Sequence, residues 1–265
     1  MALYVQKFGG TSVGTPDRMR AVADHVVRTV RRGHQVVVVI SAMGKETDDL
    51  LRIATEVSDT RPGREMDMLI TAGERKAMAL LCMAIADLGV VAESFSGAQA
   101  GFLTDSTFRN AKIVDVRPER VRTALANGHV AVIGGAQGVS PEGDETFLGR
   151  GGSDTTAVAI AHALGADSCE LYTDVTGVFT TDPRIVDNAR RMERISFDEL
   201  LEMTANGCPK PAMRCVEYAR THNVDLHVRS AFTWETGTIV TREDDTMEQA
   251  IVSAVVHDGR DDCLF

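Results

Sequence analysis

Short apolar strands, glycine turns and amphipathic helices alternate along this 265-residue chain, and this alternation constrains its fold more than any other feature. Residues 36–40 form a continuous apolar run, which is typical of a central strand covered on both faces. The repeated order of strand, small-residue turn and helix predicts a mostly parallel sheet with helices on both faces. We therefore expect an α/β fold, built as one large domain or two modest ones.

Local signals predict where several elements begin and end. Residues 66–88 have helical periodicity with an expected break at 71–74. Ser196 and Glu199 are expected to form the capping box of the next helix. Residues 144–148 should lead into a glycine-rich loop, residues 247–256 should form a last strand, and the tail should be loose.

The glycine-rich stretch at residues 149–156, GRGGSDTT, is a candidate anion site. Its three glycines lack the Cβ atoms that would keep a ligand away from the backbone, and Ser153 is expected to cap the following helix. Backbone N–H groups and the positive end of the helix dipole would then face the ligand. Arg150 could clamp a carboxylate, whereas Asp154 could position a lysine, a metal or a nucleophile.

Similar small-residue turns occur at Gly9, Gly44 and Gly134, each after a predicted strand. In a parallel sheet, ligands bind beyond the carboxyl ends of the strands. We therefore expect these turns and Gly151 to surround one ligand. Together with Lys7 at a strand end, they suit a polyphosphate, because phosphoryl transfer requires charge neutralisation and alignment.

Composition and missing motifs exclude several classes of function. A net charge of −10 argues against a nucleic-acid partner. The five cysteines have no CxxC spacing, which indicates reduced thiols and a cytoplasmic protein. The sequence has no signal-peptide pattern and no apolar run near the ~20 residues that span a bilayer, so we expect no membrane partner. Without Walker A, HExxH or GxSxG motifs, a P-loop, a metallohydrolase and an α/β-hydrolase are disfavoured.

Glu74, beside Gly73, could accept a substrate ammonium group. Taken alone, however, a solvated surface glutamate is the simpler interpretation of Glu74, and a solvated strand-end lysine is the ordinary alternative for Lys7. Single motifs therefore leave the function open, and their order along the chain carries more information.

Six motifs, in their order and spacing, resemble those of aspartokinases, which belong to the amino acid kinase family. The resemblance extends from Ala2 to about Asp258, almost the whole chain. Agreement of all six motifs is too specific to be chance. The motifs are KFGGTS at 7–12, SAM at 41–43, TAGE at 71–74, LGRGGSDT at 148–155, YTDV at 172–175 and TDPR at 181–184.

The resemblance implies a three-layer αβα sandwich in residues 1–258, with a flexible tail at 259–265. An N-terminal lobe would hold the amino acid, and a C-terminal lobe at about 150–245 would hold ATP. The implied reaction is transfer of phosphate from ATP to the β-carboxylate of L-aspartate, forming β-aspartyl phosphate. Mg²⁺ would be carried mainly by the phosphates, with no metal ligands from the protein.

The resemblance also implies roles for individual residues. Lys7 would neutralise the transferring phosphate, and Asp154 would hold that lysine. Glu74 would bind the α-ammonium group and Arg150 the α-carboxylate. The amino acid site would further include Ser41, Thr47, Ala136, Phe147 and Ser153, and the ATP site would include Lys7, Gly9, Gly10, Thr173, Asp174, Phe179, Arg184 and Lys210.

Three positions depart from the family pattern. Ala136 replaces a usual phenylalanine, and Phe147 replaces a usual threonine of the amino acid pocket. Lys210 is shifted by one place relative to a family lysine that touches ATP phosphates. These changes leave two alternatives open: the same chemistry on an aspartate-like amino acid in specialised metabolism, or a regulatory homologue without catalysis.

Length is a fourth difference, because aspartokinases usually continue into two ACT domains that bind lysine or threonine. We expect feedback inhibition by those amino acids to be absent here unless a separate regulatory subunit supplies it. The resemblance suggests a homodimer.

Overall fold

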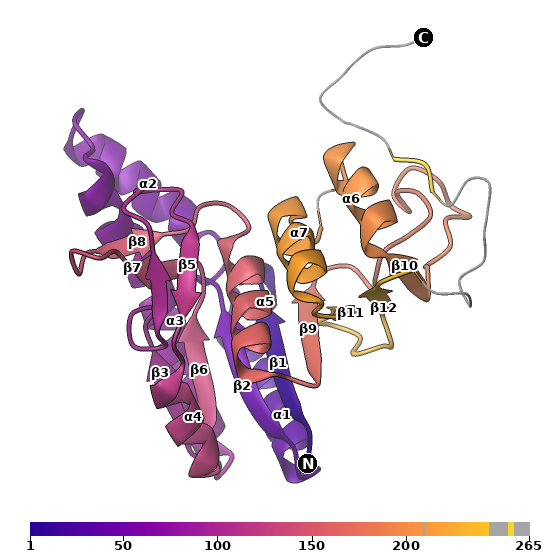
Figure 1. Cartoon of the computed structure of the whole chain (residues 1–265), viewed down its shortest axis with the longest axis horizontal. Helices are drawn as coiled ribbons and strands as arrows, with labels where there is room; N and C mark the ends of the chain where they lie inside the picture. Colours follow the sequence, from indigo (N-terminus) through magenta and orange to yellow (C-terminus); the bar gives the residue numbers. More distant parts are fainter. Residues whose placement is uncertain (209, 244–253, 257–265) are drawn as a thin grey trace.

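The computed structural model describes residues 1–208, 210–243 and 254–256, and an eight-stranded sheet lies at its centre (Figure 1). The strand order is β10–β12–β11–β9–β1–β2–β6–β3, and neighbouring strands are parallel except for the antiparallel pair β11–β12. The expected mostly parallel sheet is confirmed. Its strands are β1 (Leu3–Phe8), β2 (Gln35–Ile40), β3 (Ala92–Phe95), β6 (Val130–Gly134), β9 (Ser168–Thr173), β10 (Arg194–Ser196), β11 (Leu226–Ser230) and β12 (Thr238–Thr241).

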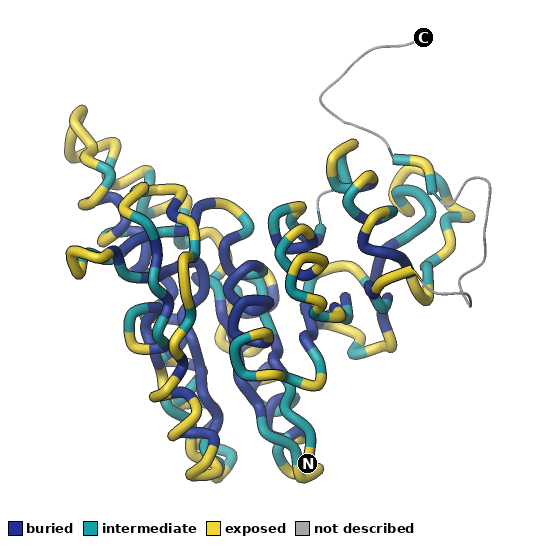
Figure 2. The backbone as a smooth tube through the Cα atoms, in the orientation of Figure 1, coloured by how far each residue is buried: buried dark blue, intermediate teal, exposed yellow. Residues whose placement is uncertain are grey.

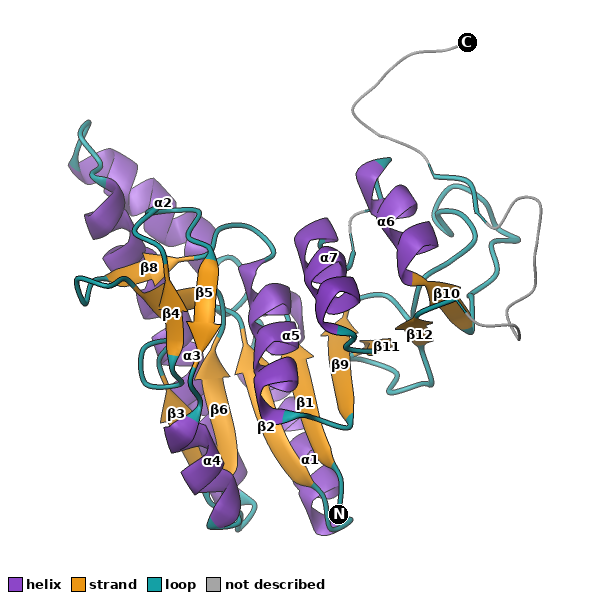
Figure 3. Ribbon diagram, in the orientation of Figure 1, coloured by secondary structure: helices purple, strands orange, loops and turns teal. Residues whose placement is uncertain are grey.

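Helices cover both faces of this sheet and complete the expected αβα sandwich (Figure 3). One face packs against α1 and α3 through a core that contains Val36, Val38 and Ile40 of β2. Val37 and Val39 belong to the core of the other face, with side chains of α4, α5, α6 and α7. The helices are α1 (Pro16–Arg31), α2 (Glu46–Val57), α3 (Gly63–Asp87), α4 (Glu119–Ala126), α5 (Gly152–Leu164), α6 (Phe197–Ala205) and α7 (Met213–His222).

A small second sheet lies beside α3 (Figure 1). Two of its strands match short strands expected at residues 99–104 and 113–116, but their assembly into a separate sheet was not predicted. Its order is β5–β4–β7–β8, built from β4 (Phe102–Thr104), β5 (Ile113–Val116), β7 (Gln137–Val139) and β8 (Glu145–Phe147). The expectation that residues 144–148 simply lead into a loop was therefore incomplete, because β8 occupies most of that segment. β7 and β8 have three residues each, which is too short to show a two-residue period.

The helix at residues 66–88 is longer than expected and has no break. α3 runs through all 25 residues of Gly63–Asp87. Gly73 lies where α3 approaches the turn after β2, and a Cβ atom there would stand 2.9 Å from the Ala42 side chain. The glycine therefore permits close packing and does not end the helix. A mid-helix glycine costs about 1 kcal/mol relative to alanine, but an alanine here would clash with Ala42.

The start of α5 differs from the expected cap. Its N-cap is Gly151, in the left-handed region at φ +74°, with no side-chain cap. Ser153 instead lies inside the first turn, because only a glycine adopts this φ readily and the helix begins there. At α6, in contrast, the expected capping box is present: Ser196 Oγ accepts the Glu199 N–H at 3.2 Å, and Glu199 Oε2 accepts the Ser196 N–H at 3.0 Å.

The expected last strand falls largely outside the described residues, as does the tail at 259–265. Residues 254–256 are described and are not strand, and the Val255 N–H donates to the Thr180 carbonyl at 2.8 Å. Burial is concentrated in the main sheet and the helix sides that face it (Figure 2). Within the described ranges, none of the helices is long and apolar enough to cross a membrane.

Candidate active site

A cavity of about 240 Å³ lies beyond the carboxyl ends of β1, β2 and β6. Segments from both sheets and three helices reach it: the turns after β1, β2 and β6, the start of α2, the middle of α3, the end of β8 and the start of α5. Every residue expected to contact the amino acid lines it, together with the two expected catalytic residues. The lining includes Lys7, Gly10, Ser41, Thr47, Glu74, Ala136, Phe147, Arg150, Ser153 and Asp154.

Lys7 and Asp154 form an ion pair in this cavity, with Nζ 2.5 Å from Oδ1. Their side chains are 13% and 14% exposed, so water screens the pair only weakly. A Cβ atom at Gly9 would stand 3.4 Å from Lys7 Nζ, so the glycine leaves this ammonium group accessible. Lys7 is therefore held in place by a carboxylate and still faces the space that a ligand would enter.

Glu74 is 3% exposed, so the interpretation as a solvated surface glutamate is wrong. Its Oε1 accepts the Ala42 N–H at 3.2 Å, while Oε2 is buried and has no hydrogen-bond partner. Burial raises the pKa of Glu74 from 4.5 to about 7, and hydrogen bonds from backbone N–H groups counteract this only in part. A ligand that brings a positive donor to Oε2 would remove this penalty.

Arg150 lines the same cavity from the glycine-rich loop and makes no ion pair within the part of the chain that the structure describes. Its guanidinium group is exposed and free to bind an anion. The cavity thus combines one unsatisfied carboxylate oxygen, one unpaired guanidinium and one held ammonium group.

The glycine turns contact one another around the cavity. The Gly44 N–H donates to the Gly10 carbonyl at 3.0 Å, and the Gly135 N–H donates to the Ile40 carbonyl at 2.8 Å. One part of the expectation needs correction: Gly151 follows β8 of the small sheet and not a strand of the main sheet. The turns nevertheless converge because α5 returns from the small sheet to the main one.

Ala136 and Phe147 form one wall of the cavity. Ala136 has a left-handed φ of +58°, and its carbonyl accepts the Leu148 N–H at 2.8 Å. The Phe147 N–H donates to Asp67 Oδ2 at 2.7 Å. Asp67 is fully buried in α3 and also accepts the Arg109 N–H, so it positions the end of β8.

Asp67 is a positioning residue that the sequence analysis missed. A usable signal was present, because Asp67 follows Met66 and precedes Ile70 on the buried side of an amphipathic helix. A carboxylate in such a place requires donors from elsewhere in the fold. Burial raises its pKa, and the N–H groups of Arg109 and Phe147 counteract that rise.

A second cavity, of about 390 Å³, lies beyond the end of β9. Asp174, Phe179, Arg184 and Lys210 line it, as expected residues of the nucleotide site, and so does Val255. Lys210 Nζ lies 2.5 Å from Asp174 Oδ1. Thr173 is not in the lining itself, but its hydroxyl donates to Asp174 Oδ1 at 3.1 Å.

The two cavities are neighbours in the fold. Parallel pairing of β1 with β9 sets Phe8 beside Tyr172. The strand ends that border the two cavities are therefore adjacent in the sheet. The segment after α6 reaches both: Lys210 lines the second cavity, while the Ala212 N–H lies 3.5 Å from Asp154 Oδ2. This arrangement can hold an acceptor and a phosphate donor next to each other.

A family model described as "Amino acid kinase family" matches residues 2–230. The chain belongs to the amino acid kinase family. Its curated relatives include the aspartokinase of Mycolicibacterium smegmatis, which is 57% identical over 97% of this chain. That match spans 62% of the relative's own length, so this chain is similar to only part of it.

Two solved structures are similar to this amino acid kinase over most of its length. The aspartate kinase of Synechocystis superposes with a TM-score of 0.82 at 46% identity, covering 91% of this chain and 40% of that one. E. coli aspartokinase III in complex with aspartate and ADP superposes with a TM-score of 0.81 at 26% identity, covering 92% of this chain and 65% of that one. These likenesses agree with the sandwich and its mostly parallel sheet.

Proposed function

We propose that this chain phosphorylates the β-carboxylate of L-aspartate with ATP and forms β-aspartyl phosphate. The observation that carries the proposal is the meeting of Glu74, Arg150 and the Lys7–Asp154 pair in one cavity. Its charges complement an amino acid with a second carboxylate. The name aspartokinase on relatives that match 97% of the chain supports the same substrate.

The substrate's head group would be bound by opposite charges. The α-ammonium group would donate to Glu74 Oε2, which otherwise lacks a partner. Arg150 would bind the α-carboxylate through its paired N–H donors. Ser41, Thr47 and Ser153 offer hydroxyl groups along the rest of the cavity, and the β-carboxylate would then point toward Lys7.

In the transfer step, a β-carboxylate oxygen attacks the γ-phosphorus of ATP. The new bond joins that oxygen to phosphorus, and the bond from phosphorus to the bridging oxygen breaks, so that ADP leaves. Lys7 would neutralise negative charge on the transferring group, because its ammonium group is fixed beforehand by Asp154. No proton transfer is required, since the attacking carboxylate is already ionised.

ATP would occupy the second cavity, with its phosphates directed toward Lys7 and the turn at Gly9 and Gly10. E. coli aspartokinase III, described with aspartate and ADP, supports nucleotide use. Lys210 and Arg184 supply cations, and Phe179 supplies an aromatic surface. Mg²⁺ would enter with the phosphates, because it commonly binds through substrate oxygens and retained water.

The direct test is a coupled assay with purified protein, ATP, Mg²⁺ and L-aspartate. Hydroxylamine would trap the acyl phosphate as a hydroxamate, while ADP formation is followed in parallel. We expect both products in equal amounts. ADP without hydroxamate would indicate simple ATP hydrolysis, and neither product with bound ATP would contradict aspartate as the substrate.

The wall formed by Ala136 and Phe147 favours a second candidate, an aspartate-like amino acid with an altered side-chain environment. The same hydroxamate assay with a panel of β-carboxyl amino acids separates the two. Efficient turnover of plain aspartate would reject the second candidate. Preference for a derivative that is reduced in Phe147→Thr would support it.

Lys210→Ala is expected to raise the KM for ATP about tenfold, because one charge-assisted contact to phosphate is lost. The Lys210–Asp174 pair is 42% and 44% exposed, so its loss should hardly affect folding. The KM for the amino acid should stay constant. Arg220→Ala, which breaks a comparably exposed pair with Asp198, is the matched control. An unchanged KM for ATP would remove Lys210 from the nucleotide site.

A further inference from the structure

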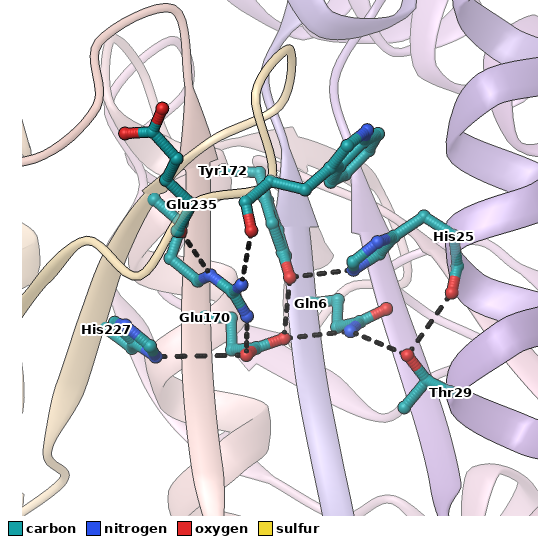
Figure 4. Close-up of polar contacts among 9 residues, drawn as sticks. Gln6, His25, Thr29, Glu170, Tyr172, His227 and Glu235 are labelled. Atoms are coloured by element: carbon teal, nitrogen blue, oxygen red, sulfur yellow. Dashed lines mark hydrogen bonds and ion pairs between the residues drawn. The ribbon is translucent and has the colours of Figure 1, made fainter. Parts of the chain in front are cut away.

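A separate polar cluster lies on the face of the main sheet that α1 covers, away from both cavities (Figure 4). At its centre, Glu170 of β9 is 4% exposed. Glu170 accepts hydrogen bonds from Gln6 Nε2 at 2.8 Å, from the Tyr172 hydroxyl at 3.0 Å and from Arg229 Nη1 at 2.8 Å. His227 Nδ1 lies farther away, at 3.8 Å.

The carboxylate of Glu170 sets the direction of the next hydrogen bonds. Because Glu170 only accepts, the Tyr172 hydroxyl must donate to it, and the phenol oxygen then accepts from His25 Nε2 at 2.7 Å. The proton of the neutral ring is therefore on Nε2, which leaves Nδ1 as an acceptor. Burial lowers the pKa of His25 to about 4, so this neutral form persists near neutral pH.

Gln6 is held in one orientation by the same carboxylate. Its Nε2 donates to Glu170, so its Oε1 points away from Glu170 (Figure 4). The residue is only 1% exposed. This Oε1 is buried and has no hydrogen-bond partner. An unsatisfied buried acceptor costs about 1–3 kcal/mol. Gln6 Oε1 is thus a buried acceptor without a donor among the described residues. His25 is half-buried, and its Nε2 is the ring nitrogen that bonds Tyr172, so its Nδ1 is left to accept from a ligand.

Both residues line a cavity of about 330 Å³, far above the roughly 10–15 Å³ that a single water needs. Trp234 lines it too and stacks on His25, with ring centroids 4.1 Å apart. Arg28 and Arg32 lie on its exposed side. Arg32 has no side-chain partner within the described ranges, whereas Arg28 pairs with an aspartate of its own helix.

We propose that this cavity is a second ligand site, which binds a small organic acid that also carries hydroxyl or amino donors. The acid group would bind Arg32, and the donors would bind Gln6 Oε1 and His25 Nδ1. A ligand that is only cationic is disfavoured, because Arg28, Arg32 and Arg229 all line the cavity.

This site is distinct from the candidate active site. Gln6 and Lys7 are consecutive in β1, and consecutive side chains of a strand point to opposite faces. Gln6 accordingly belongs to the α1 side, while Lys7 points into the first cavity. The two cavities have no lining residue in common.

Trp234 is the chain's single tryptophan, so its fluorescence reports on this site directly. The probes are D-glycerate, a small acid with two hydroxyl donors, and propionate, which has none. We expect a saturable change in fluorescence with D-glycerate and a weaker response with propionate. Arg32→Ala should raise the Kd for D-glycerate about tenfold or more.

Arg20→Ala is the matched control, because Arg20 lies on the same helix, is 68% exposed and does not line the cavity. Arg150→Ala, which alters only the first cavity, should leave the D-glycerate response unchanged. The proposal is overturned by the absence of a saturable response, by a response that Arg32→Ala does not weaken, or by equal affinity for propionate. Fluorescence reports binding and not turnover, so the test does not depend on the proposed reaction.

Discussion

Lys7→Met is expected to lower the kcat for aspartate phosphorylation by about 10²–10³-fold, the usual loss when one preorganised charge contact to a transition state is removed. Lys7 Nζ is held 2.5 Å from Asp154 and faces the cavity. Among the residues lining that cavity, Arg150 is the one other cation that could replace it. The measurement is the hydroxamate assay at saturating ATP and aspartate.

Lys7→Met leaves the carboxylate of Asp154 without its partner, and this change could destabilise the fold on its own. The double variant Lys7→Met, Asp154→Asn removes both charges and should fold while losing the same activity. Lys112→Met, at an exposed lysine of the same chain, is the control for loss of a positive charge. Retention of full activity in the folded double variant would reject Lys7 as a catalytic residue.

Glu74→Gln is expected to weaken amino acid binding and to stabilise the protein at the same time. Loss of the carboxylate removes the partner of the α-ammonium group, and truncation of a buried charge contact costs about 2–5 kcal/mol. The KM for aspartate at pH 8 should therefore rise by at least about 30-fold. The KM for ATP should not change, because Glu74 does not line the second cavity.

The stability effect has a defined dependence on pH. Burial raises the pKa of Glu74 from 4.5 to about 7, so the folded protein binds an extra proton between these values and loses stability as pH rises through them. The difference corresponds to roughly 3 kcal/mol, which is fully present above pH 7 and absent below pH 4.5. Glutamine is neutral throughout, so the free energy of unfolding of the variant should exceed that of the natural protein by an amount that grows as the pH rises from 5 to 8.

Urea unfolding at pH 5 and pH 8 measures this gain, and Glu65→Gln is the control. Glu65 lies on the same helix with its side chain 61% exposed, so its substitution should have little effect at either pH. An equal change in stability at both values of pH would show that Glu74 is ionised as an ordinary carboxyl. A normal KM for aspartate would remove it from the substrate site.

Much of the fold could be predicted because its signals are local. The apolar run at 36–40 indicated a covered central strand, and β2 is buried on both faces. The capping box of Ser196 and Glu199 involves residues three apart, so neighbouring side chains alone determine it. The order of the six motifs likewise identified residues that the structure gathers into two adjacent cavities.

Errors arose where distant segments decide the local structure. Gly73 resembles a helix break, yet close packing against Ala42 keeps α3 continuous. Ser153 resembles a cap, yet the left-handed Gly151 starts α5 two residues earlier. The small sheet was missed because its two hairpins, β4–β5 and β7–β8, are joined through the pairing of Leu103 with Val139, which lies between segments that are distant in the chain.

The amino-acid sequence is enough to predict the order of most strands and helices, the family and the kinds of side chain available for binding. The packing of distant segments, in contrast, buries Glu74 with one free oxygen, brings Asp67 to the end of β8 and brings Gln6 to Glu170 beneath α1. The reason is physical: burial and unsatisfied hydrogen bonds depend on which segments pack together. Gln6 and Glu170 are 164 residues apart, and no local pattern encodes their contact.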